Sequence, residues 1–176
     1  MSDSNSLQIQ IRQCSILEKL KALVGANYFL IVEVNQSSDP DAQESKVNSL
    51  TKRTDIAFNS TSDPAFVNHT LNFDPFDNKG KRTTVLSFEL FMAPSSVHDE
   101  NSPSDAQIQF LKDNSMLVGS FQMTLFEEHI AQLSRLEKIP LTLKLVDRLP
   151  VKMGGESKKK EIAMLEAEVS LLVNSL

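Results

Sequence analysis

The chain has 176 residues, of which 40% are hydrophobic and 23% are charged, and its formal net charge is −5. This length suits a single domain, which we predict over residues 1–176, with enough apolar side chains to form a core. The negative charge disfavours a general nucleic-acid binder, because a phosphate-binding surface needs clustered positive charge. No apolar run approaches the roughly 20 residues of a membrane-spanning helix, and the N-terminus lacks the basic start and apolar stretch of a secretory signal. We therefore expect a cytoplasmic protein that does not bind nucleic acid.

In the first half of the chain, short apolar runs alternate with polar segments, which is the pattern of an all-β sandwich. Residues 7–11 alternate apolar and polar side chains, and this predicts a strand with one buried face. The nearly continuous apolar run Tyr28 to Val34 predicts a central strand. The third and fourth strands are predicted at Lys52 to Phe58 and Phe66 to Phe73, joined by turn-forming residues as a hairpin or an adjacent crossover.

Four more strands are predicted in the second half. The fifth to seventh lie at Val85 to Met92, Met116 to Leu125 and Leu141 to Val146. The eighth is predicted at Ala163 to Val173, where apolar residues alternate with glutamate and serine. A helix is the alternative for this last segment, since alanine, methionine, leucine and glutamate are good helix formers. The alternation favours a strand.

One short helix is predicted over residues 126–138, between the sixth and seventh strands. A proline at position 140 would stop it after a stripe of apolar residues at helical spacing: Phe126, Ile130, Leu133 and Leu136. We expect this helix to pack across one end of the sandwich. The remaining long segments are expected to be loops: acidic and polar at 37–49, basic at 76–84, acidic at 94–115 and basic at 148–161.

Five segments follow one another in an order that resembles a known family. They are the strands LQIQIRQCSIL, ANYFLIVEV, LSFELF and VGSFQMTL, and the turn of Thr61, Pro64 and Phe66 with the apolar pair Leu71 and Phe73. Together they resemble the C2 domain, an eight-stranded antiparallel β-sandwich known for calcium-dependent lipid binding. The resemblance spans almost the whole chain, and it implies an all-β, C2-like fold.

The positions at which C2 domains bind calcium carry other residues in this chain. Calcium takes about six to eight oxygen ligands, which the family supplies as carboxylates from two loops. The aspartate of the second strand falls on Ala26 or Asn27, and the pair after the fifth strand falls on Met92 and Pro94. The first loop offers lysines, which would repel the ion. The resemblance therefore implies a degenerate member that lacks the calcium ligands, and we predict no metal and no cofactor.

Acidic residues elsewhere offer an alternative metal site. Asp39 and Asp41, or Asp99, Glu100 and Asp105, are close enough in sequence to meet. They fall in polar segments where a solvated charge is the ordinary state, so we favour that interpretation.

The residues that could support catalysis do not form a recognisable set. His69, His98 and His129 have no metal-ligand spacing, and the chain has no nucleophile elbow and no glycine-rich phosphate loop. The single cysteine, Cys14, cannot form an internal disulfide, and we interpret it as a small apolar strand residue rather than a nucleophile. We therefore expect a protein that is not an enzyme.

We interpret the chain as a calcium-independent protein-interaction or scaffold module. A role within a ciliary, cytoskeletal or trafficking assembly is implied by family analogy alone. The acidic segment 94–115 carries three apolar residues in a polar setting, and these are the candidate partner-binding residues: Ile108, Phe110 and Leu111. The alternative is that they pin this segment to its own sandwich.

A second hypothesis is a peripheral membrane protein that binds anionic phospholipid. Each basic residue near an anionic bilayer is worth about 1 kcal/mol, so several together would give measurable binding. The candidate lipid-binding residues lie on the third strand and in the basic loops: Lys52, Arg53, Lys79, Lys81, Arg82, Lys152, Lys158, Lys159 and Lys160.

Overall fold

The computed structural model describes the following residues: 5–17, 26–37, 47–60, 63–66, 69–79, 83–99, 103–147, 151–153, 156–158 and 161–173. Two helices lie within them, α1 (Asp105–Asp113) and α2 (Glu127–Ser134). The strands within them are β1 (Asn5–Ile16), β2 (Ala26–Ser37), β3 (Val47–Arg53), β4 (Ala57–Ser60), β5 (Thr70–Phe76), β6 (Thr83–Ala93), β7 (Met116–Leu125), β8 (Ile139–Val146), β9 (Val151–Met153), β10 (Glu156–Lys158) and β11 (Glu161–Val173).

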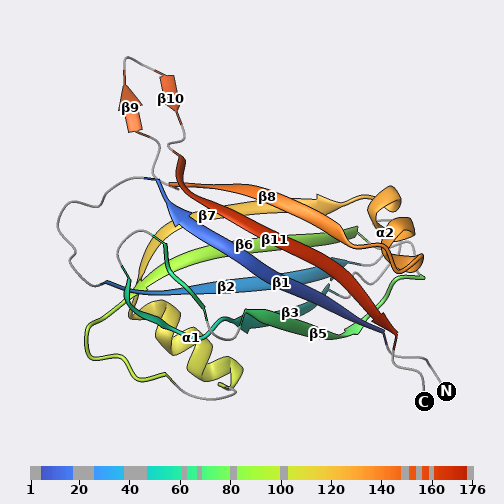
Figure 1. Ribbon diagram of the computed structural model, residues 1–176, viewed down its shortest axis with the longest axis horizontal. Helices are drawn as coiled ribbons and strands as arrows, with labels where there is room; N and C mark the ends of the chain where they lie inside the picture. The colour runs from blue at the N-terminus through green and yellow to red at the C-terminus, as the bar shows by residue number, and fades with distance from the viewer. Residues whose placement is uncertain are drawn as a thin grey trace.

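Eight strands form two packed layers. The hydrogen-bonded order is β3-β2-β6-β7-β8-β11-β1-β5, with antiparallel neighbours. Between described residues, β7 and β8 share a single bridge pair, Ser120 with Val146, so the path folds over at this point. Figure 1 shows β1, β8 and β11 crossing in front of β2, β6 and β7. The prediction of an eight-stranded antiparallel sandwich is confirmed.

The main core lies between these two layers, and it follows from the alternation in the sequence. Leu7 and Ile9 on β1 are fully buried, as are Leu30 on β2 and Phe88 on β6. Their sequence neighbours point to the opposite faces of the sheets, because successive strand side chains alternate. At the crossover, a side chain at Gly119 would place its Cβ only 3.2 Å from the Cβ of Leu145, so glycine permits this close approach.

A second, smaller core lies on the outer face of the β2–β6 layer. Phe29 on β2 and Phe91 on β6 are paired in register, and their rings stack with centroids 5.3 Å apart. Ile108 of α1 packs onto this cluster, with Leu111 beside it. The continuous apolar run in β2 is therefore explained by burial on both faces, as predicted for a central strand.

The prediction of a loop at residues 94–115 is wrong over the second half of this segment, which forms α1. Ser104 is the N-cap of this helix: its hydroxyl accepts the backbone N–H of Gln107, and its own backbone N–H donates to the Gln107 side chain, which forms a capping box. Ile108 and Leu111 then follow at helical spacing and bury one side of the helix.

The bounds predicted for the third and fourth strands are wrong, the third starting too late and the fourth too early. The structure has β3 from Val47 to Arg53, a break over residues 54–56, and the short β4, which pairs with β2 where β3 has ended. The break forms because Leu30 exchanges backbone and side-chain hydrogen bonds with Thr54. β5 runs to Phe76, and its Pro75 is tolerated because β5 is an edge strand.

The predicted helix at 126–138 exists but is shorter, since α2 ends at Ser134. Phe126 is its N-cap, and Leu136 lies beyond it with a φ of 60°. Leu133 is fully buried and Ile130 packs against the main core, whereas Phe126 and Leu136 are more than 60% exposed. α2 packs against β7, β8 and β11, at the right-hand end of the sandwich in Figure 1, as predicted for a helix that crosses one end.

The basic loop predicted at 148–161 contains the hairpin of β9 and β10, which projects from the sandwich at the upper left of Figure 1. The predicted acidic loop 37–49 ends earlier than expected, at β3, and its residues 38–46 lie outside the described residues. Within the described part of the chain, neither helix is long and apolar enough to cross a membrane.

Candidate interaction groove

A groove of about 550 Å³ lies between α1 and the segment that follows β6. We call it the α1 groove. Arg53 of β3 contributes to its lining, as do the polar side chains His98, Gln107 and Asn114. Most of its other lining residues are apolar: Pro94, Val97, Pro103, Ala106, Phe110 and Leu111. A volume of this size lies in the range of ligand pockets, which are apolar with a few polar groups.

The helix turns its apolar residues in two directions. Ile108 is only 4% exposed and reaches the second core, whereas Phe110 is 71% exposed and lines the groove. Leu111 lies between them, partly buried, and contributes to both. This arrangement anchors α1 to the sheet while leaving an aromatic side chain in solvent.

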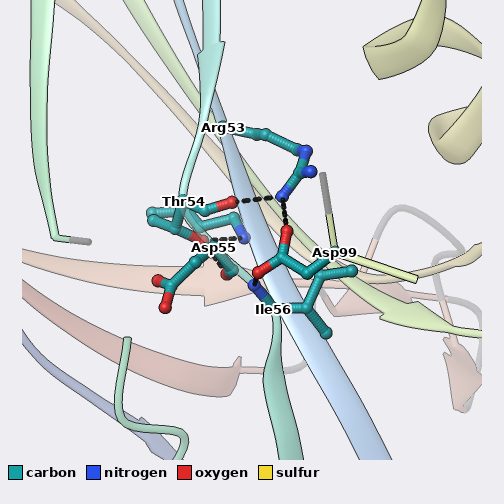
Figure 2. A network of polar contacts seen from close by, with 6 residues as sticks. Arg53, Thr54, Asp55, Ile56 and Asp99 are labelled. Atoms are coloured by element: carbon teal, nitrogen blue, oxygen red, sulfur yellow. Dashed lines mark hydrogen bonds and ion pairs between the residues drawn. The ribbon is translucent and has the colours of Figure 1, made fainter. Parts of the chain in front are cut away.

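An ion pair fixes the segment after β6 beside the groove. The Arg53 side chain is only 4% exposed, and its Nη1 lies 3.0 Å from Oδ1 of Asp99. The same nitrogen donates to the carbonyl of Thr54 at 2.8 Å, and the backbone N–H of Ile56 donates to Oδ2 of Asp99 at 3.0 Å. Figure 2 shows the contacts from Arg53 and Ile56 converging on the Asp99 carboxylate. One carboxylate thus ties the segment that leads to α1 onto the break between β3 and β4.

A second ion pair fixes the other side of α1. Nζ of Lys112 lies 2.8 Å from Oε2 of Glu89 on β6, and 5.9 Å from the centre of the Phe91 ring. A cation over an aromatic face adds to the attraction between helix and sheet. The α1 side of the groove is therefore held by packing on the second core and by the Lys112–Glu89 ion pair. The opposite side is held by the Arg53–Asp99 ion pair.

The three predicted partner-binding residues have different surroundings. Ile108 and Leu111 pack into the second core, so the alternative interpretation, that they pin this segment to the sandwich, describes their contacts. Phe110 is the member of the set whose side chain is available to a partner. Its partner-binding role stays a prediction. The sequence does not predict the groove itself, because the residues that line it come from three separate segments that meet only in the folded chain.

The predicted lipid-binding residues do not gather on the described surface. Lys52 is exposed on β3, but Arg53 is buried and paired with Asp99. Lys79 is exposed, two residues after Asp77, whose backbone carbonyl accepts a hydrogen bond from the Gln36 side chain on β2. Gln36 lies four residues along β2 from Val32, the residue paired with Lys52. The strands β9 and β10 carry Lys152 and Lys158, whose side chains are outside the description. The other four candidates lie outside the described residues: Lys81, Arg82, Lys159 and Lys160.

The cysteine and the histidines lie at separate places. Cys14 is buried in β1, as interpreted from the sequence, and burial raises the pKa of its thiol to about 12, with a smaller contribution from Asp63. Nε2 of His69 lies 3.3 Å from the amide nitrogen of Gln10, and His98 lines the α1 groove. Nδ1 of His129 accepts a hydrogen bond from the backbone N–H of Phe126 at 3.0 Å and so caps α2.

Comparison with known proteins identifies the architecture. No family model matches the chain, and no curated protein matches it. Among solved structures, a C2 domain of plant extended synaptotagmin 1 superposes with a TM-score of 0.54 and 16% identity over 100% of both chains. The fold is that of a C2 domain. A structure of CC2D1B superposes with a TM-score of 0.51 and 13% identity, covering 99% of this C2-like chain and 64% of that one. At these identities the likeness shows the fold, and the function rests on the site.

The end of the C2-like sandwich where the resemblance implies calcium ligands is occupied by other side chains. Asn27 pairs with Ala93 and Tyr28 pairs with Met92, and Ala26 and Asn27 are buried. Among the described residues, no group of three or more histidine, cysteine, aspartate or glutamate side chains is placed to hold a metal ion. Asp99, one of the alternative ligands, is engaged by Arg53 and Ile56. Calcium requires about six to eight oxygen ligands, and the described strand-end residues Ala26, Asn27, Met92 and Ala93 carry no carboxylate.

Proposed function

We propose that this C2-like domain is a calcium-independent protein-interaction module that docks a partner protein through the α1 groove. The observation that carries the proposal is Phe110, which is 71% exposed at a groove of about 550 Å³ whose walls are fixed. Aromatic side chains, phenylalanine among them, are enriched at protein interfaces relative to the rest of the surface. A fixed groove also favours binding, because little conformational entropy is lost when a partner docks.

The calcium-independent part of the proposal rests on chemistry at the two strand ends. The residues at the expected ligand positions are Ala26 or Asn27 and Met92 with Pro94, and none of them has a carboxylate. Without carboxylates a hard divalent cation has no reason to bind there. We therefore propose that the domain acts without calcium. By analogy with the fold family, we also propose that it works in the cytoplasm as a subunit of a larger assembly.

Site-specific photo-crosslinking tests this proposal. A photoreactive phenylalanine analogue at position 110 should form adducts with partner protein in extracts of the source cells, equally with calcium and with chelator. The matched control is the same analogue at Phe126, which is 62% exposed at the N-cap of α2, away from α1. Adducts that form equally from both positions, or from position 110 only with calcium, would contradict the proposal.

Binding to anionic phospholipid is the second candidate function, supported by the exposure of Lys52 and Lys79. The burial of Arg53 removes one cation from the predicted patch. The attraction of a basic patch to a bilayer depends on several cations that reach the surface together. We therefore place this function second.

A further inference from the structure

We propose that the segment docked in the α1 groove is a basic amphipathic one, with apolar side chains on one face and lysine or arginine beside them. This inference rests on the proposed function and specifies its partner. It is carried by the charges along α1, which are distributed unevenly around the groove.

An acidic row runs along the outward side of α1. Asp105, Gln109 and Asp113 are spaced four residues apart, so they lie above one another on the helix, and all three are exposed. Nε2 of Gln109 donates to Oδ1 of Asp113 at 2.8 Å and so orders the row. The neighbouring row, one position further along the chain, holds Ala106 and Phe110, which line the groove. The apolar groove thus has an acidic margin.

The cation on α1 and the arginine that lines the groove are both engaged by carboxylates. Lys112 pairs with Glu89 on the sheet side of the helix, and Arg53 pairs with Asp99. Within the described residues, Asp105 and Asp113 take part in no ion pair. The charges left over on α1 are therefore negative.

The position of Asp113 is unfavourable for the helix by itself. It lies in the last turn of α1, where the partial negative charge of the helix end disfavours a carboxylate. Lys112 occupies the same turn but is directed to Glu89. Asp113 is held by the hydrogen bond from Gln109, but within the described residues it has no cation to offset the charge of the helix end. A residue whose charge opposes its local structure is expected where binding requires it.

These features together favour a particular ligand chemistry. An amphipathic helix that lays its apolar face into a groove places its flanking side chains against the margins. An acidic margin attracts lysine or arginine there and repels both acidic segments and an anionic membrane surface. A basic amphipathic segment can place its apolar face in the groove and its lysine or arginine side chains against the acidic margin.

The inference is tested with two designed peptides of about 18 residues, long enough to form a helix. Both carry leucine at the same amphipathic positions, and their polar face is lysine in one and glutamate in the other. Fluorescence anisotropy with the full chain should show the lysine peptide binding at least about tenfold more tightly, with an affinity that falls as salt screens the charges.

Four variants locate the binding. Phe110→Ser and Asp113→Lys should each weaken the lysine peptide by about tenfold or more, because they remove the apolar anchor and reverse the margin. The matched controls, Phe126→Ser and Glu166→Lys, change an exposed aromatic residue at the N-cap of α2 and an exposed acid on β11. They should leave the affinity within about twofold, and thermal melting should show that all four fold.

The possible failures are distinguishable. Equal or tighter binding of the glutamate peptide, lost in Phe110→Ser, would overturn the basic preference while the groove remained a docking site. No binding of either peptide, or binding that neither Phe110→Ser nor Asp113→Lys weakens, would overturn the inference. Crosslinking at position 110 would then decide the proposed function separately. Dimers that sediment in the absence of peptide and are lost in Phe110→Ser would overturn it in favour of a second copy of the chain. Anionic vesicles that compete for the groove would overturn it in favour of a membrane.

Discussion

Replacing Asp99 with alanine removes the carboxylate that the Arg53 guanidinium faces in a site from which water is largely excluded. The Arg53 side chain is 4% exposed, and its Nη1 lies 3.0 Å from the carboxylate, which also accepts the backbone N–H of Ile56. In Asp99→Ala, the cation would keep the Thr54 carbonyl but lose the Asp99 carboxylate, and the Ile56 N–H would lose its acceptor. Both losses act on the same side of the α1 groove.

The magnitude follows from the burial of the two groups. Removing one partner of a fully buried pair costs about 3–5 kcal/mol, and an unsatisfied buried hydrogen bond costs about 1–3 kcal/mol. Asp99 itself is 28% exposed, so water can partly reach the cation after the substitution. We expect a loss of about 3 kcal/mol, which for a chain of this length lowers the melting temperature by about 6–12 °C.

A double-mutant cycle in urea measures the coupling. Arg53→Met should cost less, about 1–1.5 kcal/mol, because Asp99 can turn toward water and methionine retains much of the apolar contact. The double variant Arg53→Met/Asp99→Ala should cost about 2 kcal/mol, well below the sum of the single losses. Asp113→Ala is the control, since this exposed carboxylate lies in the last turn of α1, and its removal should change stability by less than about 0.5 kcal/mol.

Two results would refute the reasoning. One is a loss below about 0.5 kcal/mol in Asp99→Ala, which would mean that the carboxylate does not compensate a buried cation. The other is a double variant whose loss equals the sum of the single losses, which would mean that the two side chains act independently.

Three further predictions concern the cores and the cysteine. Ile108→Ala should lower the free energy of unfolding by about 2–4 kcal/mol, whereas Phe110→Ala should change it by less than about 0.5 kcal/mol; similar losses in chemical denaturation would contradict the two orientations. Leu133→Ala should cost about 2–4 kcal/mol, because this buried residue joins α2 to the main core, and an unchanged denaturation midpoint would contradict that role. The folded state keeps the Cys14 thiol protonated up to its pKa of about 12, whereas the unfolded chain ionises above the ordinary value of 9.0. Stability should therefore decline as pH rises from 9.0 toward 12, and Cys14→Val should reduce that decline; identical pH profiles for the two proteins would contradict it.

The sandwich was predictable because alternation of apolar and polar residues is a local signal. β7 was predicted at its observed bounds, and the last strand was correctly preferred over a helix. β3 was misplaced because much of it is polar, as suits the edge of a layer, so its sequence lacks the alternation on which the prediction relied.

α1 was missed although its sequence carries a start signal. Ser104 and Gln107 have the spacing of a capping box, and Ile108 and Leu111 follow at helical spacing. The signal was obscured by the polar and acidic composition around it. Composition indicates a solvated segment, but it does not show that one side of that segment covers an apolar sheet face.

The candidate site was predictable only residue by residue. Phe110 was named as a candidate from its apolar character in an acidic segment, but nothing in the sequence separated it from Ile108, which points the other way. Lys52 and Arg53 are adjacent in sequence, and the pairing of β3 with β2 sends them to opposite faces. Contacts between distant segments, such as Arg53 with Asp99, depend on the folded topology.

The central claim is that this C2-like domain docks proteins without calcium and does not act as a calcium-triggered membrane binder. Co-sedimentation of the full chain with anionic vesicles, run with calcium and with chelator at physiological salt, tests it most directly. We predict that the protein stays in the supernatant in both conditions. Sedimentation with vesicles only in calcium would show that a calcium site exists after all, and sedimentation in both conditions would favour the lipid-binding function.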